Sequence, residues 1–190
     1  MFRPGNTVNS GDIMHVLMKG SGTHSQPIAD LITALGSPNG LARRRARENL
    51  VGMGKPAVPA LVEALSDPMA SRHIRWESAK ALSEMRAPES APALVHALED
   101  RNFGVRWLAA EGLMRLGRAG LRPLLEALIQ HSGSFWLREG AHHVLRMLGI
   151  EDLEPELSAV LAAMEDIEPD VEVPPAAYAA LRALAERRGA

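Results

Sequence analysis

The chain of 190 residues contains no cysteine. This absence excludes disulfide bridges, thiolate metal sites and a cysteine nucleophile, and it fits a reducing compartment. Aromatic residues make up only 4% of the sequence, whereas leucine and alanine recur throughout it. Because strands favour aromatic and β-branched side chains, whereas leucine and alanine favour helices, the composition predicts an all-α fold.

The sequence also lacks a net positive charge and a long hydrophobic run. Its formal charge is −2 at pH 7, so it has no overall positive field to attract phosphate backbones or anionic membranes. The apolar run over 13–18 is far too short to span a bilayer. With 46% hydrophobic and 23% charged residues, the chain has the composition of a folded domain. We expect a cytoplasmic protein that does not bind membranes.

A pattern that repeats every 31 or 32 residues organises most of the chain. Four arginines carry it most clearly: Arg43, Arg75, Arg106 and Arg138. Leucines, small residues and closing positions recur in the same phase, namely Leu50, Leu82, Leu113, Leu145; Ala46, Ser78, Ala109, Ala141; and Gly54, Arg86, Gly117, Gly149. Recurrence at a fixed period of this length is the sequence signature of a repeat protein.

A proline opens a second pattern upstream of each arginine, and leucine or isoleucine follows it at helical spacing. The four prolines are Pro59, Pro92, Pro123 and Pro155. Proline is tolerated in the first helical turn, so each is predicted to open a helix. Polar or glycine-containing turns then separate this helix from the helix that carries the arginine. Each repeat is therefore predicted to be a helix A, a turn and a helix B.

These motifs resemble a known family. The pattern Pro-x-Leu-x-x-x-Leu, then Asp, then Val-Arg-x-x-Ala-Ala-x-x-Leu-x-x-x-Gly is similar to the short bacterial HEAT-like repeat, which also occurs in phycobilisome lyase subunits. The resemblance covers roughly residues 28–161. It implies a right-handed α–α superhelix, a HEAT-like α-solenoid, of about five helix pairs.

The two ends of the chain depart from the repeat. We expect an N-terminal tail or capping helix over 1–26, repeats over 27–164, an acidic linker over 165–175 and a C-terminal capping helix over 176–190. The terminal repeat needs a cap because stacking leaves one of its apolar sides uncovered.

The arginine column is expected to be structural. In the family, an aspartate of the turn and the arginine of helix B bond along the stack, which implies pairing of Asp67 with Arg75 and of Asp100 with Arg106. We therefore predict that all four arginines bind backbone carbonyls or carboxylates at the repeat junctions. The small residues let neighbouring helices approach closely, and the leucines fill the space between helices A and B.

Three further columns of helix B are left outside this packing, and in HEAT-type stacks this ridge lines the concave surface. Trp76 and Trp107 lie one repeat apart, so we expect neighbouring indoles flanked by charges, which is typical of protein-binding hot spots. Alternatively, the rings pack on each other and cover the stems of Lys80 and Arg115. The predicted partner-binding residues are Trp76, Trp107, Arg44, Lys80, Glu111, Glu139, His143 and Arg146.

The favoured hypothesis is a non-catalytic scaffold, monomeric and without a cofactor, that binds another protein along this ridge. The sequence contains no Gly-rich phosphate loop and no Gly-x-Ser-x-Gly motif, which disfavours the enzyme classes that depend on them. An accessory or lyase-like subunit acting on a modified protein is an alternative that only the resemblance implies.

Nucleic-acid binding is a third hypothesis, based on the basic run over 43–47. Alkylpurine DNA glycosylases, which also have a HEAT-like solenoid, need a broadly basic groove, whereas glutamates interrupt this surface, so we expect a solvated helix face. A metal site at Glu139, His142 and His143 is also disfavoured. The paired His-Glu dipeptides of iron-binding HEAT-type hydroxylases do not occur in this chain.

Overall fold

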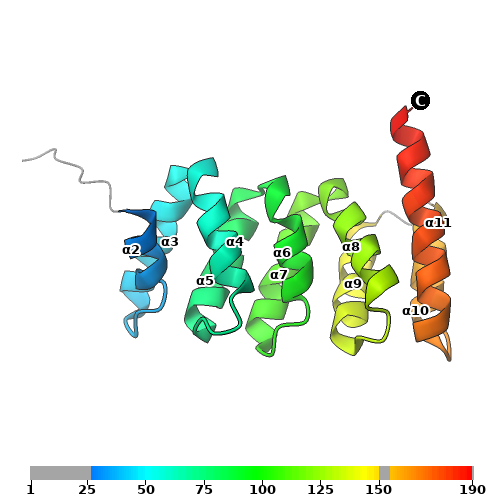
Figure 1. Ribbon diagram of the computed structural model, residues 1–190, viewed down its shortest axis with the longest axis horizontal. Coiled ribbons are helices and arrows are strands. Elements are labelled where there is room, and N and C mark those ends of the chain that lie inside the picture. The colour runs from blue at the N-terminus through cyan, green and yellow to red at the C-terminus, as the bar shows by residue number, and fades with distance from the viewer. Residues whose placement is uncertain (1–26, 150–154, 190) are drawn as a thin grey trace, which may run out of the picture.

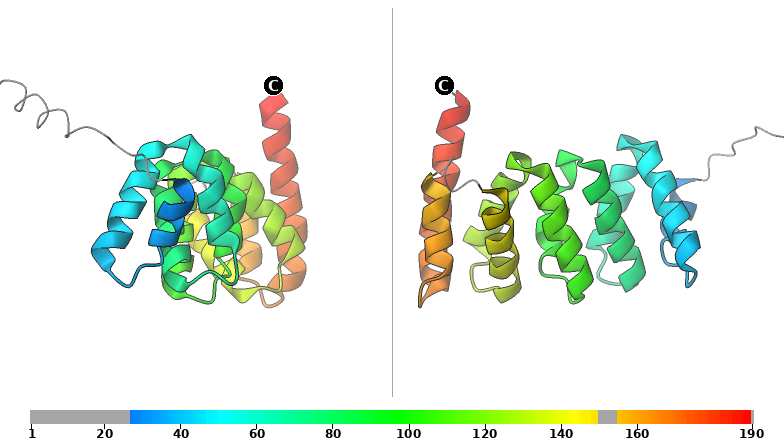
Figure 2. Two further views of the ribbon diagram at one scale, coloured as in Figure 1. Left: turned by 60° about the vertical axis from the view of Figure 1, so that its left-hand side comes forward. Right: turned by 180° about the vertical axis from the view of Figure 1, so that it is seen from behind.

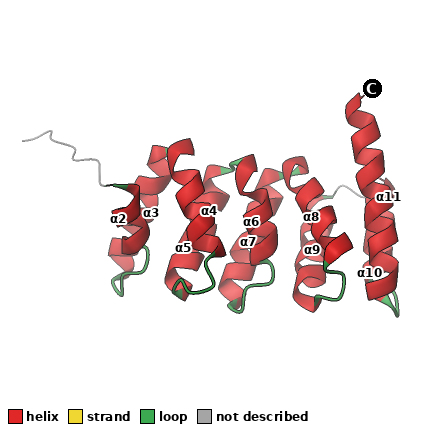
Figure 3. Cartoon of the chain, viewed as in Figure 1, coloured by secondary structure: helices red, strands yellow, loops and turns green. Residues whose placement is uncertain are grey.

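Helices make up the whole of the described structure. The computed structural model describes residues 27–149 and 155–189, and within these ranges it contains ten α-helices, two short 3-10 helices and no strand. Figure 3 shows the helices and the short loops that join them. The predicted all-α class is confirmed. The predicted N-terminal tail or capping helix over 1–26 lies outside the described residues.

The first eight helices form four A–B pairs stacked side by side (Figure 1). The A helices are α2 (Ile28–Ala34), α4 (Val58–Ser66), α6 (Ala91–Ala97) and α8 (Arg118–Gln130). The B helices are α3 (Gly40–Met53), α5 (Arg72–Met85), α7 (Phe103–Leu116) and α9 (Phe135–Leu148). Each A helix packs against the next A helix and each B helix against the next B helix, so the stack has two layers.

The start of every B helix is capped by a side chain of the preceding turn. An asparagine or serine oxygen accepts a hydrogen bond from a backbone N–H of the first helical turn, and these caps are Asn39, Ser71, Asn102 and Ser134. Such caps satisfy N–H groups that have no partner within the helix. The repeated turn chemistry therefore sets where each B helix begins.

The start of the A helices differs from the prediction in one repeat. Two A helices are preceded by 3-10 turns that contain a proline, η1 (Lys55–Ala57) and η2 (Pro88–Ser90). In α8 the residues just before Pro123 are α-helical and do not form a 3-10 turn. This helix therefore starts at Arg118, and Pro123 lies inside it. The prediction that Pro123 opens a helix was wrong, because no proline stands between Arg118 and Arg122 to stop the helix from starting earlier.

The last helix pair, α10 (Pro155–Met164) and α11 (Pro169–Gly189), sits in the stack in reverse order. α10 packs against α9 in the B layer, whereas α11 packs against α8 in the A layer, as the rear view in Figure 2 shows for α10. With this pair the described chain contains five helix pairs, as predicted. We had expected the segment from Pro155 to be an A helix. α11 packs in the stack through Val173, Ala177 and Ala180, which are buried and recur at helical spacing.

The predicted linker over 165–175 is also corrected, because α11 begins at Pro169 and includes Pro174 and Pro175. A proline in a helix leaves the carbonyl four residues earlier without its N–H donor. For Pro174 this is the carbonyl of Asp170, and the hydroxyl of Ser132 donates a hydrogen bond to it at 2.9 Å. A side chain from the α8–α9 turn thus replaces the missing donor.

α11 extends beyond the ends of the other helices at the C-terminal end of the stack (Figure 1). Of the helices in the described ranges, none is both long and apolar enough to cross a membrane.

Candidate functional site

The four arginines of the repeated column bind the turn that precedes their own helix. Arg43 Nη1 donates to the carbonyl of Ser37 at 2.7 Å, and Arg106 Nη1 donates to the carbonyl of Asp100 at 2.8 Å. The other two donate to carbonyls in the same way, Arg75 to Ala70 and Arg138 to Ser132. Each guanidinium therefore holds its own A–B turn against the first turn of helix B.

Three of these arginines also meet a carboxylate of the following helix pair. The shortest N···O distances are 3.4 Å for Arg43–Glu77, 2.6 Å for Arg75–Asp100 and 3.0 Å for Arg138–Asp170. The predicted pairing of Asp67 with Arg75 is corrected by this geometry. Arg75 points along the stack to the next turn, and the Asp67 carboxylate instead accepts from the backbone N–H of Met69 at 2.8 Å.

Arg106 differs from the other three arginines. One face of its guanidinium is covered by an aromatic ring, because the guanidinium carbon lies 3.8 Å from the ring centroid of Trp136. The ring of Phe103 lies on another side at 5.7 Å. The predicted pairing of Arg106 with the Asp100 side chain is not found, since Arg106 binds the Asp100 backbone and the carboxylate binds Arg75.

Four exposed aromatic side chains lie on the two B helices that meet at this arginine. The four members, between 48% and 68% exposed, are Phe103, Trp107, Phe135 and Trp136. Ring centroids are 6.4 Å apart for Phe103–Trp107 and 5.2 Å apart for Phe135–Trp136. All four come from the B helices α7 and α9. We call them the aromatic patch.

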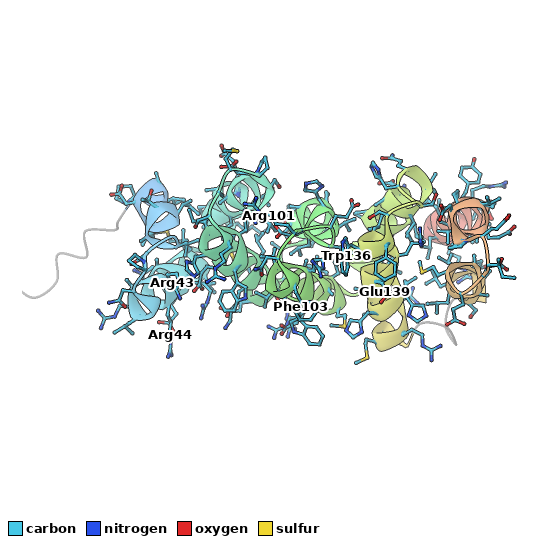
Figure 4. All side chains as sticks on the ribbon, turned by 90° about the horizontal axis from the view of Figure 1, so that it is seen from below. Arg43, Arg44, Arg101, Phe103, Trp136 and Glu139 are labelled. Atoms are coloured by element: carbon cyan, nitrogen blue, oxygen red, sulfur yellow. The ribbon has the colours of Figure 1, made fainter. Side chains whose placement is uncertain are left out.

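A groove between α7 and α9 is lined by every member of this patch except Phe135. Its lining combines aromatic, apolar and charged side chains, namely Leu98, Phe103, Arg106, Trp107, Ala110, Trp136, Glu139, Gly140 and His143. Figure 4 shows Phe103 on α7 close to Trp136 and Glu139 on α9. The imidazole of His143 lies 5.6 Å from the ring of Trp107, centroid to centroid. We call this the aromatic groove. It offers flat apolar surfaces next to one guanidinium and one carboxylate.

Gly140 lets α9 come close to the end of α6 beside the groove. A Cβ added there would lie 2.9 Å from a methyl carbon of Leu98. A larger residue at this position would push α9 away from α6, and the groove would change its width. The absence of a side chain is therefore part of how the site is built.

Trp76 and Trp107 are not the neighbouring pair that we predicted. Trp76 is half-buried against the core, and a Cβ added to Gly104 would lie 3.1 Å from its Nε1, so the indole fits where α7 has no side chain. The ammonium of Lys80 lies 5.0 Å from its ring centroid. The two indoles do not pack on each other as the alternative interpretation had it, since Trp76 lies beside Lys80 and Trp107 contacts Phe103 and His143.

The remaining predicted partner-binding residues are divided between the groove and the rest of the surface. Glu139 and His143 line the groove. Glu111 pairs with Arg115, and Arg146 is exposed in the last turn of α9. Arg44 lies on α3 at the other end of the stack (Figure 4), where its hydrogen bond lowers the pKa of the Glu48 carboxyl group.

Three of the aromatic residues were missed in the sequence, namely Phe103, Phe135 and Trp136. They occupy the first turn of their B helices, two or three positions before the arginine of the repeat. The corresponding positions of α5 are Arg72 and His73, so the column is not aromatic throughout. A search for aromatic residues at equal phase in adjacent repeats would have found Phe103 and Phe135.

Three of the four arginines in the basic run over 43–47 form ion pairs with glutamates. Arg47 Nη1 lies 2.5 Å from Glu77 Oε2, and both side chains are buried. Glu77 binds Arg43 as well, whereas Arg45 is exposed. Guanidinium groups held by a buried glutamate are poorly placed to bind phosphates, which weakens the nucleic-acid hypothesis. Among the described residues, no group of three or more His, Asp or Glu side chains is placed to hold a metal ion.

Comparison with known proteins identifies the repeat type of part of the chain. Residues 28–114 match the family model for HEAT repeats. Among solved structures, the complex of CpcE and CpcF of phycocyanin lyase from Nostoc sp. PCC7120 resembles this chain with 23% sequence identity and a TM-score of 0.43, covering 88% of this chain and 68% of that chain. No curated protein matches the chain.

Proposed function

Since the chain is a HEAT-like repeat protein, we propose that it is a non-catalytic scaffold that binds another protein through the aromatic groove. The observation that carries the proposal is the gathering of four exposed aromatic side chains on two adjacent B helices. Contiguous exposed apolar surface usually marks an interaction site, and tryptophan is enriched among the residues that dominate binding energy.

The size of the aromatic side chains makes such a contact strong enough to matter. Burying the roughly 125 Å² that a half-exposed indole retains contributes about 3 kcal/mol before the costs of association are subtracted. Trp107 and Trp136 both lie about half exposed, at 52% and 48%, so each retains surface that a partner can bury. Two such contacts would dominate the affinity of a short protein segment.

The groove is also ordered before a partner arrives. The Trp136 ring is stacked on Arg106, and the Trp107 ring packs beside His143. Side chains that are already held in place lose less conformational entropy when they bind. The arrangement therefore favours binding by a surface that does not have to rearrange.

Affinity capture from native lysate tests the proposal. The wild-type chain is expected to recover a stoichiometric protein, and the double variant W107A/W136A is expected to lose it. The matched control is Tyr178→Ala, which removes a ring that is 57% exposed on α11, away from the groove. Thermal unfolding of all three proteins establishes that they are folded.

Equal recovery by the double variant would contradict the assignment of this surface. Loss of recovery by Tyr178→Ala as well would also contradict it, because the effect would not be specific to the groove. The expected result is therefore loss in the double variant alone.

The accessory or lyase-like alternative stays a prediction, as do the monomeric state and the cytoplasmic location. An absorbing chromophore that copurifies with the chain would favour that alternative.

A further inference from the structure

We infer that the segment bound in the aromatic groove presents a carboxylate to Arg106, so that the partner offers an aspartate or glutamate flanked by apolar residues. This inference rests on the proposed function and specifies the chemistry of its ligand. It follows from a comparison of Arg106 with the other arginines of the repeated column.

Arg75 shows how such an arginine is satisfied within the stack. Its Nη1 binds the turn carbonyl of Ala70, and its other edge holds both oxygens of the Asp100 carboxylate, with Nε–Oδ2 at 2.6 Å and Nη2–Oδ1 at 3.3 Å. This two-point contact with a carboxylate is the geometry for which a guanidinium is best suited.

Arg106 makes only the first of these two contacts. Its Nη1 donates to the Asp100 carbonyl at 2.8 Å, but within the described parts of the chain neither Nε nor Nη2 has a hydrogen-bond acceptor, and no carboxylate lies within ion-pair distance. In Arg75 the guanidinium edge formed by Nε and Nη2 binds Asp100. The same edge of the Arg106 guanidinium is therefore available to a ligand.

The reason for this difference lies in the sequence of the next turn. Arg106 donates to Asp100 and Arg138 donates to Ser132, each six residues earlier, so Ser132 occupies the position that corresponds to Asp100. A serine cannot supply the carboxylate that Arg106 would otherwise bind. The aspartate of its own turn is already engaged by Arg75 and by the backbone N–H of Asn102.

The aromatic rings prepare this guanidinium for a ligand. Trp136 covers one face of Arg106 at 3.8 Å, which fixes the plane of the group and leaves its edge for hydrogen bonds. Apolar rings lower the local dielectric beside the guanidinium, so a charge-assisted hydrogen bond there is stronger than on an open polar surface. The apolar faces of Phe103 and Trp107 can receive the residues next to the acid.

The surrounding charges favour a protein carboxylate over a nucleic acid. Arg106 is the only lysine or arginine among the residues that line the groove, and Glu139 lines it too. A phosphate backbone brings many closely spaced negative charges and needs a broadly basic surface. A single carboxylate between uncharged residues needs only one guanidinium.

A random peptide library displayed on phage, selected against the full chain, tests the inference. The enriched sequences are synthesised with a fluorophore, and their dissociation constants are measured by fluorescence polarisation. We expect enriched peptides to contain an aspartate or glutamate next to apolar residues. Arg106→Gln should weaken binding about tenfold to a hundredfold, the range of one charge-assisted contact.

A change in the peptide provides a measurement that does not depend on the folding of a variant. Replacing the acidic residue of the peptide by its amide, Asp by Asn or Glu by Gln, should weaken binding to the wild-type chain by the same factor. The Arg106→Gln variant should not distinguish the two peptides. Arg106→Lys keeps the charge but loses the two-point contact, so it should give intermediate affinity.

The outcomes separate this inference from the proposed function. Peptides that need Trp107 and Trp136 but bind the Arg106→Gln variant equally well would overturn the inference and leave the binding surface in place. If no enriched peptide loses affinity in W107A/W136A, both the inference and the proposed function are overturned. Competition by a DNA duplex that depends on Arg106 would also overturn the inference, because the anion would then be a phosphate.

Discussion

At the scale of single residues, the repeat imposes a backbone conformation on whatever residue occupies its closing position. All four closing positions have positive φ, at 68° for Gly54, 52° for Arg86, 58° for Gly117 and 59° for Gly149. Glycine occupies three of these four positions, and it adopts positive φ without a steric penalty. Arg86 adopts the left-handed conformation of Gly149 although it has a Cβ, whereas ψ is −143° at Gly54 and −131° at Gly117.

The change Arg86→Gly should therefore stabilise the protein. A non-glycine residue in the left-handed region costs about 1–2 kcal/mol, part of which is offset by the greater freedom of glycine in the unfolded chain. The Arg86 side chain is exposed, so little is lost with it. We expect the free energy of unfolding, measured by urea denaturation, to rise by about 0.5–1 kcal/mol. A decrease would mean that the side chain stabilises the cap.

At the scale of elements, the junctions between repeats depend on contacts that link one turn to the next helix pair. The pair Arg75–Asp100 is almost fully buried, with side chains 3% and 8% exposed. Sequence spacing could predict that these residues face the junction. It could not predict which aspartate each arginine meets, because that depends on how far one repeat is displaced relative to the next.

Two matched substitutions measure this junction. Asp100→Ala leaves the Arg75 guanidinium buried without its carboxylate, and we expect a loss of about 3–5 kcal/mol in unfolding free energy. Asp67→Ala removes only an exposed side-chain contact within its own turn, and the expected loss is about 1 kcal/mol or less. Similar losses in the two variants, measured by urea denaturation, would contradict the pairing of Arg75 with Asp100.

At the scale of the whole molecule, the stack is closed at its C-terminal end by the reversed pair. α11 lies against α8 and α10 against α9, and Val173 is fully buried. In repeat proteins each repeat contacts only its neighbours, so a local change spreads little along the stack. The two ends of the chain should therefore respond separately to mutation.

Val173→Asp should loosen the C-terminal end alone. A carboxylate buried without a partner is strongly unfavourable, so amide hydrogen exchange should become faster in α8, α10 and α11 but stay unchanged in α4 and α5. The control is Val171→Asp on the same helix, where the valine is 61% exposed and the effect should be small. Faster exchange throughout the stack would contradict the nearest-neighbour behaviour.

The sequence by itself determined the helical class, the length of the repeat and the position of its turns. Those features depend on residues close together in the chain, such as caps, glycines and leucines at helical spacing. Only the tertiary structure decided that α10 lies in the B layer and α11 in the A layer, that Trp76 packs against Gly104, and that Trp136 covers one face of Arg106. These contacts join residues of different helix pairs, and their distances depend on how the pairs stack.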